Sequence, residues 1–412
     1  MISICIIAGG KGSRSINPNT PKSLHLIDGK PLIWHQLKCL NRFNAEVTFV
    51  LGFGAGEIIE FIEENMSLYP NLKIDFIVES NSRGTLSAYR EFLVKKSAED
   101  TVLILGDLFF DFDLRSFYLQ HLSSKADLSV VTHPNDHPHD SDLISFDLFN
   151  NKVLSFFEKG KVNDLSFRGN NAVAGIYMVK NSTLENLKSN SEDFTSTVIN
   201  YLLMHSKKVI NYTSIEYIKD TGTPARIKEV SDYVSFEQGD KQKLNCIFLD
   251  LDNTLIPNWE IKKNCDSPII PPETKEIIHA INVRNIPLIV CSNQPGIAKN
   301  FFSESDMNLF VRSLQFELSQ HKAFINDWFI CPHHPEKGWP NERRDLKLIC
   351  ECRKPKVGLF VNAQKKHRIV FEKSIYIGDQ ESDRLLAQSL GINFFMVESY
   401  EYLAETISRV AI

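Results

Sequence analysis

The 412-residue sequence contains no run of 18 or more apolar residues, which excludes an ordinary membrane-spanning helix. Its first residues, Met1–Cys5, lack the basic start of a secretory signal peptide and begin a short apolar run, so we expect a buried strand there. Cysteine is sparse, with eight residues, and this excludes a disulfide-rich scaffold. Basic residues are outnumbered by acidic ones, which gives a formal net charge of -5, and this balance disfavours a nucleic-acid partner. We therefore expect a cytoplasmic protein that binds neither membrane nor nucleic acid.

The sequence does contain enough apolar material for two domains. Hydrophobic residues make up 43% and charged residues 24%, the balance of a globular protein, and the length exceeds that of one ordinary domain. Short apolar runs alternate with amphipathic stretches in both halves, which is typical of βα units around a parallel sheet. We expect two Rossmann-like three-layer α/β/α domains over residues 1–232 and 244–412, joined by a polar linker at 233–243.

The apolar runs predict where the strands lie. In the first half the predicted strands are Ser3–Ala8, Glu46–Leu51, Lys73–Val78, Thr101–Leu105 and Leu128–Thr132. In the second half they are Cys246–Leu249, Pro287–Cys291, Ser374–Ile377 and Asn393–Val397.

A glycine-rich turn follows the first predicted strand. Gly9, Gly10 and Gly12 would let the backbone approach a polyphosphate closely, so that its N–H groups can hold phosphate oxygens. Arg14 and Lys22 would supply positive charge where a leaving pyrophosphate develops its own. On the glycines alone, a tight turn without a ligand is an equally good interpretation.

Two aspartates suggest a metal site in the same half. Asp107 follows the apolar run Val102–Leu105, at the edge of the sheet where open α/β folds bind ligands. Asp220 lies in Lys219–Pro224, and two carboxylates from separate strands can hold a Mg²⁺ that bridges phosphates. Either aspartate could instead cap a turn or a helix.

The order of these motifs, from Ala-Gly-Gly-Lys-Gly-Ser-Arg through Pro-Lys, Gly-Asp and Glu-Lys-Gly to Asp-Thr-Gly-Thr-Pro, resembles the sugar-1-phosphate nucleotidyltransferases over about residues 1–230. In that family a sugar phosphate attacks the α-phosphate of a nucleoside triphosphate and expels pyrophosphate. The resemblance implies that the triphosphate is handled by Gly9, Gly10, Arg14 and Lys22. It also implies that Asp107 and Asp220 hold Mg²⁺ and that Lys159 contacts the sugar phosphate. Gly84 belongs to the glycine-threonine pair near the base, but Arg83 stands where leucine is usual, which leaves base recognition open.

A second set of chemistry-bearing residues begins at Asp250 and Asp252, just past a predicted strand. Carboxylates two positions apart on extended chain point the same way. One can then attack phosphorus while the other transfers protons, provided that Mg²⁺ screens the phosphate. An Asx turn is the alternative interpretation of this pair.

Further along the chain, polar residues end two more predicted strands. Ser292 can bond a phosphoryl oxygen, Lys354 supplies a cation, and Asp379 and Asp383 supply carboxylates. Taken singly, Ser292 could be a helix cap and Lys354 a solvated surface residue. In this order the residues resemble the haloacid dehalogenase superfamily of phosphohydrolases. The resemblance makes Asp250 the nucleophile and Asp252 the general acid/base. It makes Ser292 and Lys354 the phosphate binders, and it places Mg²⁺ among Asp250, Asp252, Asp379 and Asp383.

A loop with zinc-ligand spacing lies within the second half. Cys331, His333, Cys350 and Cys352 would give three sulfurs and one imidazole, a closed tetrahedral set typical of a structural Zn²⁺ site. His334 competes with His333 as a ligand, and another thiophilic metal would suit the same donors.

Within the superfamily, a zinc loop that leads into Cys-Arg-Lys-Pro-Lys resembles the D-glycero-D-manno-heptose 1,7-bisphosphate phosphatases and the related histidinol-phosphate phosphatases, over about residues 245–400. The resemblance implies that Asn293, Arg353 and Lys354 flank the substrate. Leu251 and Asn253 depart from it, because arginine and glycine are usual there.

The two resemblances together imply consecutive reactions. Removal of the 7-phosphate from a heptose 1,7-bisphosphate yields heptose 1-phosphate, which a nucleotidyltransferase would consume, with GTP favoured as the donor. Three alternatives stay open: a degenerate domain with a regulatory role, a phosphatase for histidinol phosphate, and one for nucleic-acid ends. The expected partners are small molecules with Mg²⁺ at both sites and structural Zn²⁺, and the sequence leaves a homo-oligomer open.

Overall fold

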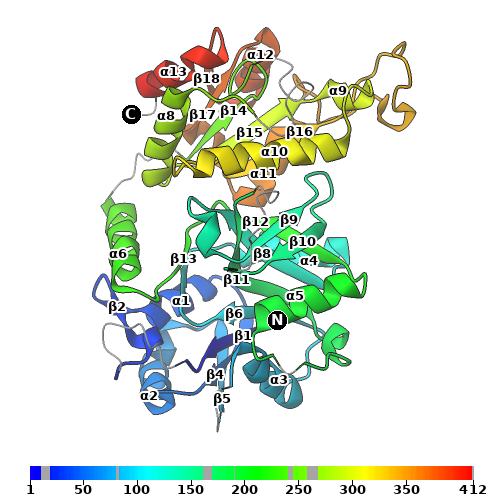
Figure 1. The fold of residues 1–412 in the computed structure, drawn as a ribbon. Helices are drawn as coiled ribbons and strands as arrows, with labels where there is room; N and C mark the ends of the chain where they lie inside the picture. Colours follow the sequence, from blue (N-terminus) through cyan, green and yellow to red (C-terminus); the bar gives the residue numbers. More distant parts are fainter. Residues whose placement is uncertain are drawn as a thin grey trace. The chain divides into compact units, whose positions relative to one another are not determined.

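The structure is a computed structural model that describes residues 1–10, 19–79, 83–160, 169–189, 191–239, 245–257 and 268–410 (Figure 1). The chain divides into two compact units. The first consists of Met1–Val131, Val173–Tyr212 and Glu216–Lys241, and the second of Thr132–Ala172, Thr213–Ile215 and Gln242–Ile412. Residues Thr132–Ala172 precede the predicted linker yet group with the second unit, so the boundary at 233–243 stays a prediction. Among these described residues, no helix has the length and apolar character needed to cross a membrane.

The elements before the predicted linker are helices and strands in mixed order. The strands are β1 (Ile2–Ala8), β2 (Leu26–Ile27), β3 (Lys30–Pro31), β4 (Ala45–Leu51), β5 (Leu72–Val78), β6 (Asp100–Leu105), β7 (Leu108–Phe110), β8 (Leu128–Pro134), β9 (Leu143–Phe146), β10 (Val153–Phe157), β11 (Asn171–Lys180), β12 (Val209–Thr213) and β13 (Ile218–Asp220). The α-helices are α1 (Leu32–Leu40), α2 (Ala55–Asn65), α3 (Thr85–Lys95), α4 (Leu114–Ser124), α5 (Phe194–Met204) and α6 (Pro224–Gly239). Short 3-10 helices are η1 (Lys22–Leu24), η2 (Met66–Leu68), η3 (Pro138–Asp140) and η4 (Asn181–Leu184).

The main sheet of this half is mixed. Its path runs β10-β9-β11-β6-β1-β4-β5, with β8 pairing β11 and β12. Strands β4 and β6 lie parallel to β1 on either side, whereas β11 is antiparallel to β6 and β10 is antiparallel to β9. The sequence pattern was typical of βα units around a parallel sheet, and in this part antiparallel neighbours such as β9 and β10 join the parallel strands, because they need only a short turn between them.

Alternation along β1 explains the layers on its two faces. Ile4 and Ile6 are fully buried in a core that also contains Leu37 of α1 and Ile58 of α2. Helix α3 packs against β1 and β4, and its Tyr89 is fully buried. A strand that is covered on both faces has a continuous apolar sequence, as β1 does.

The second half carries its own set of elements. The strands are β14 (Cys246–Leu249), β15 (Leu288–Asn293), β16 (Asp327–Cys331), β17 (Ser374–Gly378) and β18 (Asn393–Met396). The α-helices are α8 (Pro272–Val283), α9 (Pro295–Ala298), α10 (Glu304–Ser319), α11 (Gly358–His367), α12 (Glu381–Leu390) and α13 (Leu403–Val410), and the 3-10 helices are η5 (Arg344–Leu346), η6 (Phe371–Lys373) and η7 (Tyr400–Tyr402).

These five strands form a parallel sheet in the order β16-β15-β14-β17-β18. Ile247 and Leu249 of β14 belong to the core cluster that contains residues of α8, α10 and α13, and Phe248 belongs to the one that contains residues of α11 and α12. The chain leaves β14 toward β15 on one side and returns to β17 on the other. This makes the carboxyl end of β14 a topological switch point, where α/β sheets bind ligands.

The predicted strands are all present, with ends that differ by one or two residues. The three-layer α/β/α fold class is confirmed for both halves. Strand β16 was not predicted, because its short sequence begins with the polar Asp327.

Candidate active sites

The first candidate site lies at the carboxyl end of β6. Gly106 packs so closely that a Cβ atom there would lie 2.6 Å from the carbonyl oxygen of Ile7, so only glycine lets β6 end beside β1. The carboxylate of the next residue, Asp107, forms an ion pair with the Nζ of Lys22 in η1, at 2.7 Å. The structure therefore brings together two of the residues that the sequence singled out.

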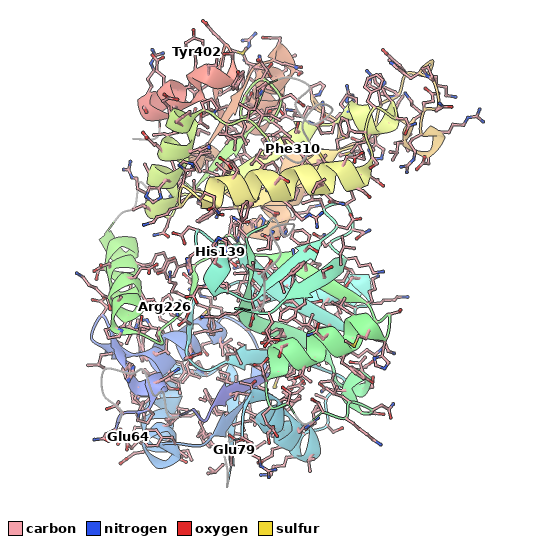
Figure 2. All side chains as sticks on the ribbon, in the orientation of Figure 1. Glu64, Glu79, His139, Arg226, Phe310 and Tyr402 are labelled. Atoms are coloured by element: carbon pink, nitrogen blue, oxygen red, sulfur yellow. The ribbon has the colours of Figure 1, made fainter. Side chains whose placement is uncertain are left out.

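Asp220 lies beside this pair. Strand β13 is antiparallel to β7, with Asp220 opposite Leu108, and the backbone N of Thr221 donates to the carbonyl oxygen of Asp107 at 2.9 Å. The carboxylate of Asp220 pairs at 2.6 Å with Arg226 of α6, an arginine that Figure 2 labels. Arg226 was missed because nothing in the sequence distinguishes it from other helical arginines.

The glycine turn after β1 is only partly described, and Gly12 and Arg14 lie outside the described residues. A Cβ at Gly9 would lie 2.7 Å from the carboxylate of Glu79 and 3.2 Å from the backbone N of Gly52, whereas a Cβ at Gly10 would meet nothing. Among the described residues, therefore, none crowds a side chain at Gly10. Glu79, which the sequence reasoning missed, follows β5 and is 7% exposed, and burial raises its pKa to about 6.

Two other predicted ligand contacts have structural partners. Gly84 adopts a φ of 136°, and a Cβ there would lie 2.5 Å from the carbonyl oxygen of Glu192, so the backbone alone requires glycine. Lys159 belongs to the second compact unit and pairs with Asp140 at 2.5 Å, while its backbone N donates to Asp142.

The second candidate site is built around a buried lysine at the carboxyl ends of β14 and β17. The Nζ of Lys354 lies 2.8 Å from Asp250 and 2.9 Å from Asp383, and all three side chains are almost completely buried. It also donates to the hydroxyl of Tyr376 at 2.9 Å, and that hydroxyl donates to Asp383 at 2.7 Å. Tyr376 of β17 was missed, because a tyrosine within a buried strand equally suits core packing.

The electrostatics of this cluster follow from its burial. Burial raises the pKa of Asp250, and the neighbouring charge of Lys354 acts in the opposite direction. Burial would lower the pKa of Lys354, but Asp250 and Asp383 outweigh it, so the pKa is raised and the ammonium stays charged. The lysine thus compensates two buried carboxylates.

Asp252 accepts a hydrogen bond from a neighbouring amide. Its Oδ2 accepts a hydrogen bond at 2.6 Å from Gln294, which also donates to the hydroxyl of Ser292 at 3.1 Å. The side chain of Asn293 bonds the backbone N and carbonyl oxygen of Lys354, which fixes the backbone that carries this lysine. Gln294 is a further residue that the sequence reasoning did not assign.

Asn253 explains one departure from the resemblance. It adopts a φ of 57°, in the left-handed region that glycine and asparagine tolerate best, so asparagine can replace glycine here. Its amide also donates to Asp379 at 3.1 Å. The replacement therefore keeps the turn and adds a contact to the carboxylate cluster.

A divalent cation fits the cluster of Asp250, Asp379 and Asp383. One oxygen from each lies within 4.8 Å of the others. The Oδ1 of Asp379 is buried and has no hydrogen-bond partner among the described residues, as expected of an atom placed to bind a cation. Hard oxygen ligands of this kind suit Mg²⁺. The group does not include Asp252.

The four predicted zinc ligands also converge. The sulfurs of Cys331, Cys350 and Cys352 lie 3.1–3.6 Å apart, and the Nδ1 of His333 lies 3.2 Å from Cys352. These sulfur separations exceed the length of a disulfide, about 2 Å, and approach the spacing of thiolates around one metal ion. The hydrogen bond from Cys331 lowers the pKa of Cys352 to about 5, which favours a thiolate. His334 instead packs its ring against Trp339.

Comparison with known proteins bears on both halves. Residues 4–235 match the family model described as nucleotidyl transferase, and residues 245–400 match the model described as polynucleotide kinase 3 phosphatase. The chain is similar to the D-glycero-alpha-D-manno-heptose-1,7-bisphosphate 7-phosphatase of Photorhabdus laumondii, at 31% identity over 36% of this chain and 80% of that protein. It is also similar to the D-glycero-alpha-D-manno-heptose 1-phosphate guanylyltransferase of Aneurinibacillus thermoaerophilus, at 28% identity over 54% of this chain and 94% of that protein.

Among solved structures, the chain is similar to UDP-glucose pyrophosphorylase in complex with UDP-glucose, over 57% of this chain and 100% of that one. The identity is 18% and the TM-score is 0.50, so this similarity shows the fold alone. The chain thus belongs to the nucleotidyl transferase family through its first half and to the family of the D-glycero-D-manno-heptose 1,7-bisphosphate 7-phosphatases through its second.

Proposed function

We propose that this chain is a bifunctional enzyme of nucleotide-heptose synthesis. Its second half would remove the 7-phosphate from D-glycero-D-manno-heptose 1,7-bisphosphate, and its first half would transfer a guanylyl group from GTP to the heptose 1-phosphate. The observation that carries the proposal is the presence of both families in one chain, since the product named for one relative is the substrate named for the other.

In the phosphatase site, Asp250 would attack the phosphorus while Asp252 protonates the departing sugar oxygen, so that the sugar–phosphate bond breaks as an aspartyl-phosphate forms. Water would then attack the same phosphorus and give its proton to Asp252, which releases phosphate and restores Asp250. Gln294 holds Asp252 in place at 2.6 Å, and Lys354 neutralises charge beside Asp250. Mg²⁺ held by the carboxylate cluster would screen the phosphate and orient the attack.

Other residues of the second half would bind the substrate and stabilise the loop. Ser292 and Lys354 would contact the transferring phosphate, and Asn293 and Arg353 would flank it. The donor set of Cys331, His333, Cys350 and Cys352 supports a structural Zn²⁺ without an open position. Because free thiols of this kind persist under reducing conditions, we keep the cytoplasm as the proposed compartment.

In the transferase site, Asp107 and Asp220 would hold Mg²⁺, which would neutralise negative charge on the phosphates of GTP. The proximity of their chain segments supports this role. Lys22, with Arg14 and the glycines 9, 10 and 12, would bind the triphosphate, Gly84 would lie near the base, and Lys159 would reach the sugar phosphate. The phosphate oxygen of heptose 1-phosphate would attack the α-phosphorus and displace pyrophosphate, with catalysis by positioning and charge neutralisation.

A second candidate for the phosphatase half is action on a nucleic-acid end. The match of residues 245–400 to a model described as polynucleotide kinase 3 phosphatase favours it. The net charge of -5 and the zinc-type donor set count against it. Histidinol phosphate is a less favoured substrate, because its dephosphorylated product would not be a substrate for the nucleotidyltransferase half.

The test is a coupled assay with purified protein, Mg²⁺, GTP and each anomer of heptose 1,7-bisphosphate, in which phosphate, pyrophosphate and nucleotide-sugar are quantified. We expect all three products in equal amounts. Asp250→Asn should abolish phosphate release from the bisphosphate but leave guanylyl transfer to added heptose 1-phosphate, and Asp107→Asn should do the reverse. Intact heptose bisphosphate, together with rapid dephosphorylation of an oligonucleotide 3′ end, would establish the second candidate instead.

A further inference from the structure

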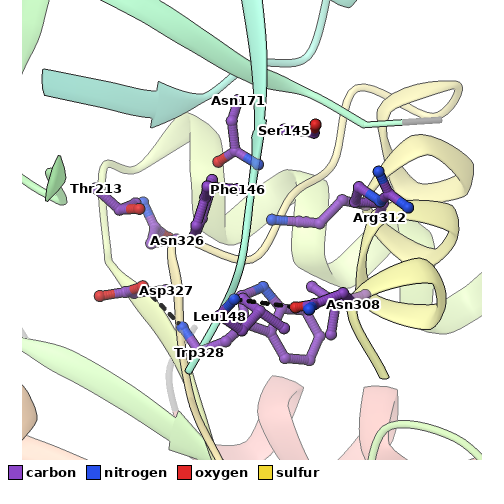
Figure 3. A pocket seen from close by; sticks show the side chains of 12 residues that line it. Ser145, Phe146, Leu148, Asn171, Thr213, Asn308, Arg312, Asn326, Asp327 and Trp328 are labelled. Atoms are coloured by element: carbon purple, nitrogen blue, oxygen red, sulfur yellow. Dashed lines mark hydrogen bonds between the residues drawn. The ribbon is translucent and has the colours of Figure 1, made fainter. Parts of the chain in front are cut away.

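A cavity lies in the second compact unit, at the amino end of the edge strand β16 and away from the carboxylate cluster at the carboxyl ends of β14 and β17. Its lining comes from β9 and the turn after it, the start of β11, helix α10 and the start of β16 (Figure 3). Asp327 and Trp328 are the first two residues of β16, whereas the carboxylates of the cluster follow the carboxyl ends of β14 and β17. The space measures about 390 Å³, with the open solvent at its mouth included. The proposed reactions make no use of it.

Arg312 of α10 brings an uncompensated positive charge to this cavity. Its Nε is buried and has no hydrogen-bond partner, and no carboxylate pairs with the guanidinium within the described part of the chain. Burial lowers the pKa of Arg312, and no acidic neighbour acts against this. A guanidinium remains protonated even so, and a partly buried charge without a partner costs free energy.

The carboxylate that does line the cavity is already engaged. Asp327 accepts from the backbone N of Trp328 through one oxygen, at 2.9 Å, as Figure 3 shows. Its other oxygen accepts from His367 at 2.6 Å and from Lys366 at 2.8 Å. Asp327 therefore cannot serve as the partner of Arg312 without losing these contacts.

The cavity contains hydrogen-bond donors that the described residues leave without a partner. The indole N–H of Trp328, a side chain that is 8% exposed, has no partner in the described structure. The side-chain oxygen of Asn308 accepts from the backbone N of Leu148 at 2.9 Å, which leaves its NH₂ group as the donor (Figure 3). The amide of Gln315 is already engaged, because its oxygen accepts from the backbone N of Ile325 and its NH₂ group donates to the carbonyl oxygen of Ile325. Unused donors around a guanidinium match an oxyanion, which accepts several hydrogen bonds at once.

We propose that this cavity binds a small oxyanion of the phosphate or carboxylate class, with Arg312 as the charged ligand and Trp328 and Asn308 as further donors. The inference stands on the cavity alone and does not depend on the proposed reactions. An anion bound there would join α10 to the turn after β9, because Asn308 already holds Leu148 of that turn. It would therefore stabilise the packing of Thr132–Ala172 within this unit.

The test compares phosphate-free wild-type protein with Arg312→Gln and with Arg409→Gln, which removes an exposed arginine that pairs with Glu405. Isothermal titration with inorganic phosphate at fixed ionic strength should show one site fewer in Arg312→Gln than in wild type and Arg409→Gln. Phosphate should also raise the Tm of Arg312→Gln by several degrees less than that of the other two proteins. Without phosphate, Arg312→Gln should be at least as stable as wild type, because it removes an unpaired charge.

Trp328→Phe is the second variant, because it keeps the ring and deletes only the N–H. We expect phosphate affinity at this one site to fall about tenfold, the effect of one lost hydrogen bond to an anion. Parallel titrations with acetate and pyrophosphate distinguish a carboxylate from a phosphate ligand. Equal numbers of sites and equal Tm increases in wild type and Arg312→Gln for all three anions would overturn the proposal.

Discussion

Tyr376 offers the sharpest test of how the phosphatase site is organised. The ammonium group of Lys354 has three hydrogens and three acceptors at 2.8–2.9 Å, namely Asp250, Asp383 and the hydroxyl of Tyr376. Tyr376→Phe removes one acceptor, and it also removes the hydroxyl that donates to Asp383. No water can easily replace it, because the side chain is fully buried. Tyr376 is thus a positioning residue that acts through Lys354.

The expected size of the effect follows from the lost contacts. A hydrogen bond to a charged group contributes about 1.5–3 kcal/mol, and 1.4 kcal/mol corresponds to a factor of ten in rate. We therefore expect kcat for phosphate release to fall by about 10- to 100-fold in Tyr376→Phe. KM should change less, because the hydroxyl holds the lysine rather than the substrate.

The assay is phosphate release from heptose 1,7-bisphosphate between pH 5 and 9, with guanylyl transfer measured on the same preparation. Transfer should be unchanged, which controls for folding of the first half. Tyr402→Phe, at a tyrosine that is 50% exposed, is the matched control and should retain full activity (Figure 2). Wild-type kcat in Tyr376→Phe across this pH range would refute the positioning role.

Three further predictions concern the backbone, the metal loop and acid stability. Gly84→Ala should lower the free energy of unfolding by about 2 kcal/mol in a urea titration, because its φ of 136° strains any side chain and Glu192 blocks the space. Gly56→Ala, where a Cβ meets nothing, is the control, and equal stability of the two variants would contradict the reasoning. A thiophilic chelator should lower the Tm of the wild-type protein and release one metal ion per chain, and the variant Cys352→Ser should purify without this metal ion. A wild-type protein whose Tm is the same with and without the metal ion would argue against the site. The pKa of Asp327 is lowered to about 2, because the charges and hydrogen bonds of Lys366 and His367 outweigh the effect of its burial. The ionised carboxylate therefore contributes about 2 kcal/mol to the free energy of unfolding above pH ~4, and this contribution is lost as the pH falls toward 2. Asp327→Asn should therefore show a flatter dependence of the urea midpoint on pH between 5 and 3 than wild type, and parallel curves would show that the ion pair contributes nothing.

The sequence predicted what depends on local pattern. Short apolar runs identified the main strands, and polar residues after them, such as Asp107 and Asp250, marked the ligand edge because parallel strands end together. The zinc-type ligands converge as their spacing implied.

Contacts set by register and packing could not be predicted in this way. Arg226 reaches Asp220 only because α6 starts beside β13, and Tyr376 reaches Lys354 only through the alternation of β17. Glu79 lies against Gly9 because β5 ends beside β4, which in turn pairs with β1. The antiparallel strands β9 and β10 likewise depend on pairing partners that a local apolar run does not specify.

The pairing of Lys22 with Asp107 and of Arg226 with Asp220 has a consequence for the order in which ligands bind. Each carboxylate already has a cation, so a bare divalent ion must compete with two intramolecular ammonium and guanidinium groups and gains little on arrival. A metal ion that arrives with its triphosphate brings anionic oxygens toward which Lys22 and Arg226 can turn as they release the aspartates. If Asp107 and Asp220 hold Mg²⁺ as proposed, the site would therefore select the metal–nucleotide complex over its separate components, and the two basic side chains would keep the site charge-balanced without a ligand.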